Sequence, residues 1–220
     1  MGVLSKQKAR KEYRCGKCGA TIAKGTEYYK ITKKFERPKY RCLKCYPKPS
    51  ELATSDKVSR ILSAQESLEE LSVEETVESL DDVLSQIESS KDEAESVADD
   101  YEESADNMEE YFSGSSQIDE IREKAENIRE WVSQLEDAYS QIEEKKDELE
   151  EAIEKKDELK SQIEEIDQRL KEELKQEKRT DLENQKSLLE GQLKEAESEI
   201  EDLVGEVRST LNDATSSLNI

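Results

Sequence analysis

Two pairs of cysteines constrain the fold of this 220-residue chain more than any other feature. Cys15 pairs with Cys18 and Cys42 with Cys45, each across two residues, and the sequence has no other cysteine. A C-x2-C turn brings two thiolates to one ion, so two such turns complete the tetrahedral shell of a structural Zn²⁺ site. Because no position is left for a reactive water, we expect the metal to hold a fold together and not to catalyse a reaction.

Other interpretations of the four cysteines are open at this stage. Two disulfide bonds or four unbound thiols would also fit an even number, and an iron–sulfur cluster uses the same ligands. The paired turns favour zinc, and the chain has no histidine that could act as an alternative ligand. Thiolates that bind a metal indicate a reducing compartment, so we expect the protein in the cytoplasm.

Charge divides the chain near residue 50. The whole sequence has 34 Lys or Arg against 56 Asp or Glu, a net charge of -22. Residues 1–49 hold 15 Lys or Arg and three Glu, a net charge of +12, which leaves -34 for residues 50–220. All three prolines lie in the first segment as well. We therefore predict a basic arm with a zinc ribbon over residues 1–49 and an acidic helical domain over residues 50–220.

The first segment is predicted to contain a flexible arm, residues 1–11, and a ribbon, residues 13–47. The arm is basic and shows no apolar periodicity. In the ribbon, Lys24-Gly25 suits a hairpin turn, and β-branched and aromatic side chains favour a strand at 28–32 with a shorter strand at 39–42. So few residues cannot bury enough apolar surface to fold unaided, and the metal must supply most of the folding free energy.

Parts of the ribbon resemble known zinc modules. Cys15-x2-Cys18, followed by Ile-Ala-Lys-Gly-Thr-Glu-Tyr at 22–28, is similar to the opening of the zinc finger of poly(ADP-ribose) polymerases, which binds DNA breaks. That family closes its site with a histidine and a cysteine, whereas this chain has Cys42 and Cys45. The run at 41–52 looks more like small zinc-ribbon proteins encoded by bacteriophages. This resemblance covers about the first seventy residues, and it implies a viral origin and a location in the host cytoplasm.

Long helices are predicted after the ribbon, because no proline follows Pro49. Apolar spacing predicts four of them, over residues 55–71, 73–112, 117–175 and 181–216. Start signals for the last three are Ser72 with Glu75, Ser116 with Asp119, and Thr180 with Glu183.

The helix at 117–175 carries a heptad repeat that predicts a coiled coil. Its seam, meaning the positions that face a partner helix, consists of Ile128, Trp131, Leu135, Ala138, Ile142, Lys145, Leu149, Ala152, Lys156, Leu159, Ile163, Ile166 and Leu170. A polar turn at 175–179 and a shift of the seam in the last helix predict an antiparallel hairpin. The predicted fold class is therefore mostly α, a small N-terminal zinc ribbon followed by a long antiparallel coiled-coil rod. Parallel pairing with a second copy is the alternative, and a homo-oligomer built on the hairpin fits the same pattern.

No catalytic constellation is present, so we expect a binding protein and not an enzyme. The chain lacks histidine and a Gly-rich phosphate loop, and carboxylates on a rod lack the pocket that shifts a pKa toward catalysis. No apolar run approaches the ~18 residues of a membrane helix, and residues 1–11 do not resemble a signal peptide. We expect a soluble protein without a membrane partner.

Basic and aromatic residues of the ribbon are candidate nucleic-acid contacts. Lys and Arg bind phosphates with release of counterions, and aromatic rings stack on unpaired bases. The candidates are Lys30, Lys33, Lys34, Arg37, Lys39 and Arg41 with the rings of Tyr28, Tyr29, Phe35 and Tyr40. Strand alternation puts Tyr28 and Lys30 on one face and Tyr29 and Ile31 on the other. Not all of these rings can reach a base, and some are expected to form the small core of the ribbon.

A second hypothesis assigns the function to the acidic residues 50–220. A net charge of -34 attracts basic proteins and repels phosphates. Such a rod would bind a protein partner as a DNA mimic, an inhibitor or an assembly spacer, with the ribbon as a purely structural or docking module. The simplest alternative is that the acids only keep a long coiled coil soluble.

Overall fold

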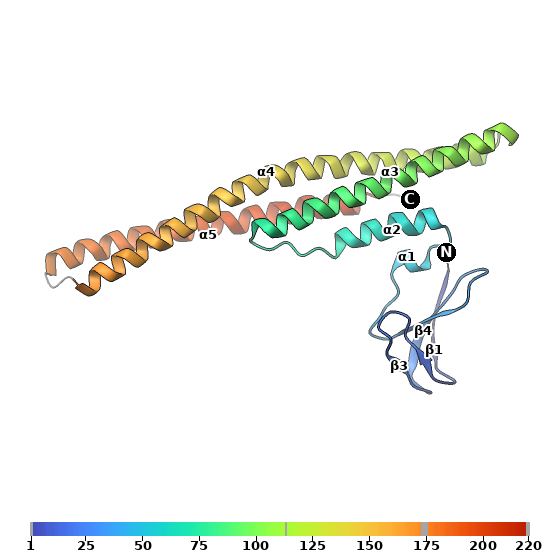
Figure 1. Ribbon diagram of the computed structural model, residues 1–220, viewed down its shortest axis with the longest axis horizontal. Helices are drawn as coiled ribbons and strands as arrows, with labels where there is room; N and C mark the ends of the chain where they lie inside the picture. Colours follow the sequence, from blue (N-terminus) through green and yellow to red (C-terminus); the bar gives the residue numbers. More distant parts are fainter. Residues whose placement is uncertain (1, 113, 173–175, 219–220) are drawn as a thin grey trace. The chain divides into compact units, whose positions relative to one another are not determined.

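The computed structural model describes residues 2–112, 114–172 and 176–218 (Figure 1). Short strands come first and long helices follow, so the chain is mostly α as predicted. In chain order the elements are β1 (Val3–Lys8), β2 (Tyr13–Arg14), β3 (Thr21–Ile22), β4 (Glu27–Thr32), β5 (Lys39–Cys42), α1 (Pro49–Leu52), α2 (Asp56–Glu69), α3 (Val77–Phe112), α4 (Ser116–Glu172) and α5 (Gln176–Ser216).

These residues divide into two compact units. The first holds the described residues of Met1–Glu70, Ser89–Ser133 and Ser217–Ile220, and the second holds Leu71–Glu88 and Gln134–Ser216. The strand region, α1 and α2 thus belong to one unit, whereas α3 and α4 each contribute to both. The boundary predicted at residue 49 rests on charge and stays a prediction.

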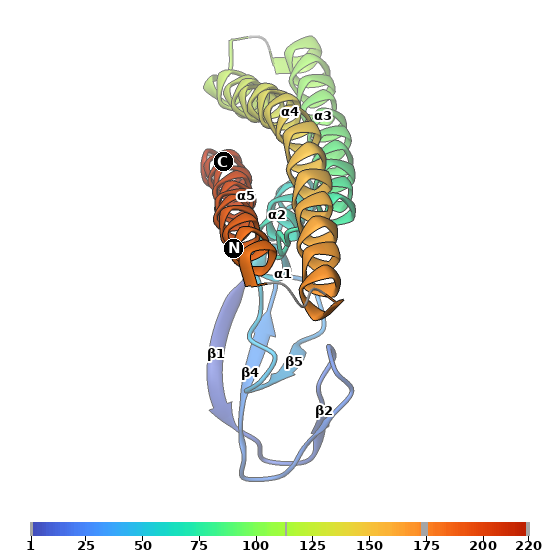
Figure 2. The ribbon, with the colours of Figure 1, turned by 90° about the vertical axis from the view of Figure 1, so that its left-hand side faces the viewer.

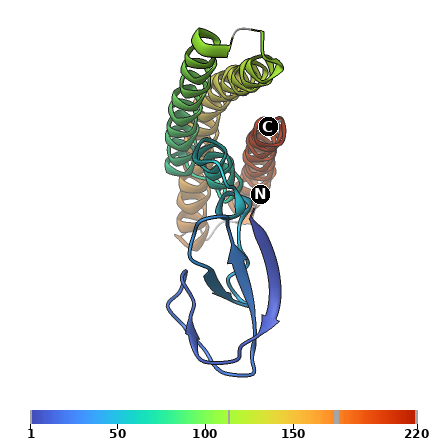
Figure 3. The same cartoon turned by 90° about the vertical axis from the view of Figure 1, so that its right-hand side faces the viewer.

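A three-stranded antiparallel sheet in the order β1-β4-β5 organises the strand region, and β2 and β3 pair separately (Figures 2 and 3). The strands predicted at 28–32 and 39–42 correspond to β4 and β5. Tyr28 lies opposite Cys42 and Ile31 lies opposite Lys39, so the cysteine is at the open end of the β4–β5 hairpin. Tyr28 and Ile31 lie on opposite faces of the sheet, and both are buried.

Residues 3–8 form a strand, so the prediction of a flexible arm is wrong. β1 runs antiparallel to β4 over its whole length, from Val3 to Lys8. Backbone hydrogen bonds hold it there with little apolar burial, since Val3 is exposed and only Leu4 and Ser5 are half-buried. Such a strand leaves no apolar alternation in the sequence, which is why periodicity could not reveal it.

A buried carboxylate of α2 fixes the short helix α1, for which the sequence carries no periodic pattern. Glu66, only 7% exposed, accepts hydrogen bonds from the backbone N–H of Ser50 at 2.8 Å and from the Ser50 hydroxyl at 2.6 Å. Ser59 donates its hydroxyl to the Ser50 carbonyl at 2.9 Å. Pro49 begins α1, at the position where a missing N–H costs nothing. The two helices are therefore joined through one serine.

Helix α2 packs on α3 within the first unit. Ile61 and Leu68 of α2 are at most 1% exposed. Arg60 reaches across to two carboxylates of α3, Glu93 at 2.5 Å and Asp100 at 2.7 Å. Apolar burial thus supplies the contact, and a shared guanidinium offsets part of the negative charge of α3.

Ion pairs show that α3 and α4 are antiparallel in the first unit. Arg122 of α4 pairs with Asp106 and Glu109 of α3, and Arg129 pairs with Asp99 and Glu102. The α3 partners move toward the N-terminus as the α4 residue moves toward the C-terminus, which only antiparallel helices allow.

The second unit shows the same arrangement for α4 and α5. Lys145 pairs with Glu206 at 3.0 Å and Lys155 with Glu199 at 3.2 Å, and Lys186 of α5 pairs with Asp167 of α4 at 2.6 Å. The predicted antiparallel hairpin is therefore confirmed. In the same unit, the guanidinium of Arg208 donates to the carbonyl of Val73 at 2.7 Å.

The predicted seam of α4 is its buried face. Ile128, Trp131, Leu135 and Ile142 are at most 1% exposed. The polar seam residue Lys145 is half-buried and also pairs with Glu148 of its own helix at 2.8 Å. A lysine is tolerated at this position because carboxylates on both helices bind its ammonium group.

Several helix ends differ from the predicted ones. α3 begins at Val77 and not at residue 73, because Thr76 accepts the Ser79 N–H at 3.2 Å and acts as the cap in place of Ser72. α4 begins at Ser116, with Ser115 accepting the Gln117 N–H at 3.3 Å. In both cases the helix start is capped by the hydroxyl of a different residue, at most four positions from the predicted one.

The turn predicted at 175–179 is wrong over residues 176–179, which the structure describes. Residues 176–180 are already helical, so Thr180 and Glu183 lie inside α5 and form no start signal. Gln, Glu, Lys and Arg are good helix formers, and a polar run of them does not stop a helix. Residues 173–175, which were predicted to end the preceding helix and open the turn, lie outside the described residues.

Replacement of Glu66 by alanine should destabilise the first unit. The Glu66→Ala change leaves the buried N–H and hydroxyl of Ser50 without acceptors, which costs about 2–3 kcal/mol. Urea unfolding of the metal-loaded protein would measure this, followed by the fluorescence of Trp131, the sole tryptophan and a buried residue of the first unit. Glu69→Ala, an exposed change on the same helix, is the control. Equal losses in both variants would contradict the role of Glu66.

Candidate functional site

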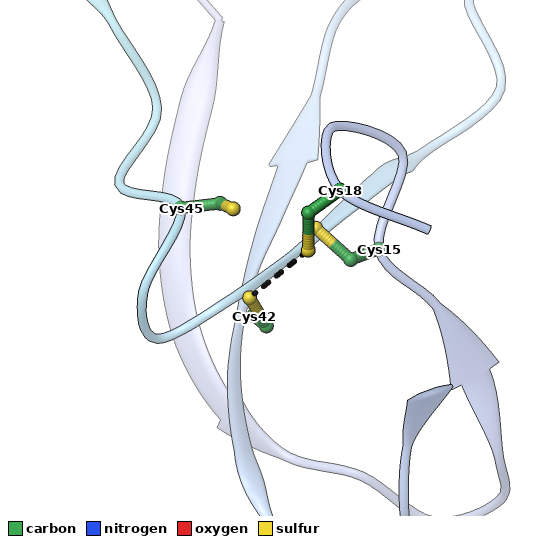
Figure 4. Close-up of side chains that lie close together, drawn as sticks. All are labelled: Cys15, Cys18, Cys42 and Cys45. Atoms are coloured by element: carbon green, nitrogen blue, oxygen red, sulfur yellow. Dashed lines mark hydrogen bonds between the residues drawn. The ribbon is translucent and has the colours of Figure 1, made fainter. Parts of the chain in front are cut away.

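The four cysteines converge at one point, as the sequence predicted. Cys15 follows β2 and Cys42 ends β5, while Cys18 and Cys45 lie in the turns after them (Figure 4). All four sulfur atoms lie within 4.8 Å of one another, and the Sγ atoms of Cys18 and Cys42 are 3.7 Å apart. Metal–sulfur bonds of about 2.3 Å in a tetrahedron place neighbouring sulfurs about 3.8 Å apart. The site therefore fits one metal ion, and the cysteines form no disulfide.

Backbone hydrogen bonds shape each cysteine turn. In the first turn the N–H of Gly19 donates to the carbonyl of Cys15 at 2.9 Å, and Gly19 has a φ of 70°, which glycine adopts without strain. In the second turn the N–H of Cys45 donates to the carbonyl of Cys42 at 3.0 Å. The two turns thus aim their thiols at the same point.

A buried arginine joins the metal centre to α1. Arg41 binds the Glu51 carboxylate through Nε at 3.0 Å and Nη2 at 2.8 Å, and it is 9% exposed. Its guanidinium crosses Gly16, where a Cβ atom would lie 2.5 Å from Nη1, so a side chain at residue 16 would displace it. Glu51 already neutralises this buried charge, and the predicted contact of Arg41 with nucleic acid stays a prediction.

The thiols of Cys15 and Cys45 differ in acidity. Burial disfavours the thiolate of Cys15, but backbone N–H groups of Cys18, Cys42 and Lys17 outweigh burial and lower its pKa to about 6. Hydrogen bonding with the neighbouring thiols, Cys18 foremost, raises the pKa of Cys45 to about 12. A metal must therefore displace the proton of Cys45 when it binds at neutral pH.

Two of the tyrosines proposed for base stacking, Tyr28 and Tyr40, pack in the core of the ribbon. Tyr28 is 3% exposed and packs among Ala9, Cys15 and Ile22. Its ring centroid lies 5.3 Å from that of Tyr13 and 5.8 Å from that of Tyr40. Tyr40 is half-buried, with its ring 4.4 Å from that of Tyr13. Packing in the small core therefore covers the ring of Tyr28, and the stacking of Tyr40 on a base stays a prediction.

The remaining cationic candidates differ in their surroundings. Lys30 is half-buried on the same sheet face as Tyr28. Lys39 is exposed and pairs with Glu36 at 3.3 Å. Lys33 is half-buried, and its Cγ lies 3.0 Å from the position of a Cβ on Gly2.

Lys34 and Arg37 are the two candidates that extend into solvent without an ion pair to any described residue. With Phe35 between them they belong to the loop that joins β4 to β5, residues 33–38, which we call the β4–β5 tip. Tyr28 and Cys42 mark the metal end of the hairpin, so this tip lies at its other end. Of the predicted nucleic-acid residues, the structure thus brings Lys33, Lys34 and Arg37 together in one loop.

None of the described helices has an apolar stretch long enough to cross a membrane. Comparison of the chain with protein-family models, with curated proteins and with solved structures found no match. The function is therefore inferred from the residues of the site.

Loss of one thiolate should remove the metal and unfold the ribbon while the long helices persist. Cys42→Ser leaves three ligands, and the buried apolar residues of the ribbon are too few to hold it without metal. We expect metal content near zero and rapid proteolysis within residues 1–49, with most helical circular dichroism retained. Lys44→Ser changes an exposed residue of the same turn and should leave the metal bound. A protease-resistant ribbon in the Cys42→Ser protein would contradict this prediction.

Metal affinity should rise with pH. Protons compete with the metal for the thiols, and the raised pKa of Cys45 keeps at least one proton to be displaced throughout the range from pH 6 to 8. Each displaced proton makes the apparent affinity about tenfold weaker per unit fall in pH. Competition titrations with a chelator of known affinity would measure this slope. A pH-independent affinity would show that the thiols are not the ligands.

Proposed function

We propose that this chain is a non-enzymatic zinc protein that binds nucleic acid through the β4–β5 tip of its ribbon. The metal assignment is supported by four thiolates in two C-x2-C turns, a donor set that suits Zn²⁺. Sulfur atoms within 4.8 Å of one another enclose a single ion and leave no room for a cluster of irons. Metal analysis should give one zinc per chain, and visible absorbance typical of iron–sulfur clusters would overturn the assignment.

The exposed cations of the β4–β5 tip are the observation that carries the proposal. Lys34 and Arg37 have no acidic partner among the described residues, whereas the nearest ribbon carboxylate, Glu36, is held by Lys39. Glu27 is likewise paired with Lys6 at 2.9 Å. The one carboxylate of the tip, Glu36, is thus engaged, and the excess positive charge is free to bind phosphates.

In this proposal the metal has a structural role, which is to hold the β4–β5 hairpin in place. The zinc fixes the end of β5 at Cys42, and the antiparallel register then fixes where the chain turns, three residue pairs farther along the hairpin. The metal itself stays at the other end of the hairpin and contacts no nucleic acid. Its role is to hold the β4–β5 tip in one shape, so that few conformations are lost on binding.

Charge reversal at the tip tests the proposed function. We expect the Lys34→Glu and Arg37→Glu double variant to bind oligonucleotides much more weakly than the unsubstituted protein at low salt. Two lost phosphate contacts should reduce the slope of log affinity against log salt by about 1.4 to 1.8. Fluorescence anisotropy of labelled oligonucleotides with the full-length zinc protein at several salt concentrations would measure both.

A matched control makes the same change of charge far from the ribbon in the sequence. Lys160→Glu with Lys171→Glu alters two exposed lysines of α4 and should leave affinity and slope nearly unchanged. Failure of the unsubstituted protein to bind any oligonucleotide at low salt would overturn the proposal. Equal losses in the two double variants would show that only the net charge matters.

The composition of α3 favours a second candidate function, the binding of a basic protein. The 36 residues of this helix include 14 Asp or Glu and one Lys. In the first unit, arginines occupy some of these carboxylates, but Asp92, Glu95 and Glu103 are exposed with no ion pair to the described residues. A protein partner with a basic surface fits this helix, and its binding would weaken on substitution of these three acids by Gln or Asn.

A further inference from the structure

The β4–β5 tip holds a phenylalanine in a conformation that such residues rarely adopt. The N–H of Glu36 donates to the carbonyl of Lys33 at 3.3 Å, which makes Lys33 to Glu36 a four-residue turn with Phe35 in its third position. Phe35 has a φ of 67°, and it is the one non-glycine residue with a positive φ among the described residues. Glycine or asparagine is usual at such a position, because a bulky L side chain is strained there.

The ring of Phe35 is also almost fully exposed. It is 95% exposed, more than any other large apolar side chain in the described part of the protein. The other ribbon aromatics pack on one another, Tyr13, Tyr28 and Tyr40 in the core and Tyr29 against Tyr46. An exposed ring contributes no burial to folding, and this one sits on a strained backbone as well. Folding of the chain alone therefore gives no reason for phenylalanine at residue 35, which points to a ligand.

One cation lies over this ring, and two more belong to the same loop. Lys34 Nζ lies 5.0 Å from the ring centroid, and Lys33 and Arg37 are its neighbours in the loop. One flat apolar face between positive charges matches the chemistry of a nucleotide, which has a flat base and a phosphate on each side. A base inside an intact duplex is already stacked on both faces, so an inserted ring has nowhere to go without opening the helix.

We propose that Phe35 stacks on an unpaired base, so that the ligand of the β4–β5 tip is single-stranded nucleic acid. This inference rests on the proposed function, which concerns phosphate binding by the same loop, and adds the class of nucleic acid. Lys34 and Arg37 bind phosphates of any nucleic acid, whereas Phe35 gives the preference for unpaired strands. Base identity is not selected, because every base offers a stacking face.

Two substitutions at residue 35 separate stacking from charge and from folding. Phe35→Asn keeps the net charge and suits a positive φ, so the protein should unfold at the same temperature or a slightly higher one. It should bind a single-stranded oligothymidylate about 5- to 150-fold more weakly, the range expected for one lost stacking contact. Its affinity for a blunt duplex of equal length should stay within about twofold of the unsubstituted value.

Phe35→Trp provides a direct readout of the same contact. It should retain the affinity for oligothymidylate, and its added fluorescence should be quenched when the strand binds. The native Trp131 is 1% exposed, so the unsubstituted protein supplies a background that should not change. Phe112→Ala removes a ring that is 68% exposed on the acidic helix α3, and this control should bind as the unsubstituted protein does.

Three results would overturn the inference while leaving the proposed function intact. They are unchanged oligothymidylate affinity in Phe35→Asn, an equal loss for the single strand and the duplex, and no quenching in Phe35→Trp. Binding to anionic phosphatidylserine vesicles that is lost in Phe35→Asn, without a single-strand preference, would also overturn it by making the ring a membrane contact. If the unsubstituted protein binds neither oligonucleotide, the proposed function fails first and the inference falls with it.

Discussion

The thiolate centre is the constraint on which the strand region depends. The ribbon buries Ala9, Ile22 and Tyr28 together with Cys15, and this is far less apolar surface than an independent fold needs. A metal bound by the four thiolates would replace that missing burial by joining the turn after β2 to the end of β5. Strand β4 is then held between β1 and β5, and the loop at the far end of the hairpin takes one shape.

Neighbouring contacts extend this constraint into the helices of the first unit. The ion pair of Arg41 with Glu51 connects β5 to α1, and the hydrogen bonds of Ser50 with Glu66 connect α1 to α2. Each link consists of a buried charge with a hydrogen-bonded partner, and such links are specific in geometry, because a misplaced partner leaves a charge without solvation. The ribbon and the helix pair should therefore respond together when one of these residues is changed.

The sequence was most informative where structure depends on local repetition. Heptad spacing identified the buried face of α4 from Ile128 to Ile166, and C-x2-C spacing identified the metal ligands, because each pattern is repeated within a few residues. Contacts between distant residues left no such pattern. Strand β1 pairs through its backbone, which leaves no side-chain pattern. The hydrogen bonds between Ser50 and Glu66 involve one serine and one glutamate that no motif in the sequence distinguishes from the others.

The candidate site shows the same division. Composition showed that the ribbon is basic and aromatic, but it could not show which aromatic rings pack in the ribbon core. Tyr28 and Tyr40 pack in the ribbon core, and Arg41 forms an ion pair with Glu51. Only the fold shows that Phe35 is left exposed, since its exposure and its positive φ depend on where the turn falls.

The hydrogen bond between Arg208 and the carbonyl of Val73 has a consequence for the order of folding. It closes a loop of 135 residues, whereas the bonds of Glu66 to Ser50 and of Lys186 to Asp167 close loops of 16 and 19. Short loops cost less chain entropy and form sooner, so the ribbon with α2 and the α4–α5 hairpin are early structures. The start of α3 acquires its α5 neighbour only after that helix has left the ribosome. Until then the contact that Arg208 makes with Val73 is absent, and synthesis rate and chaperone supply should affect the yield of this protein more than its final stability does.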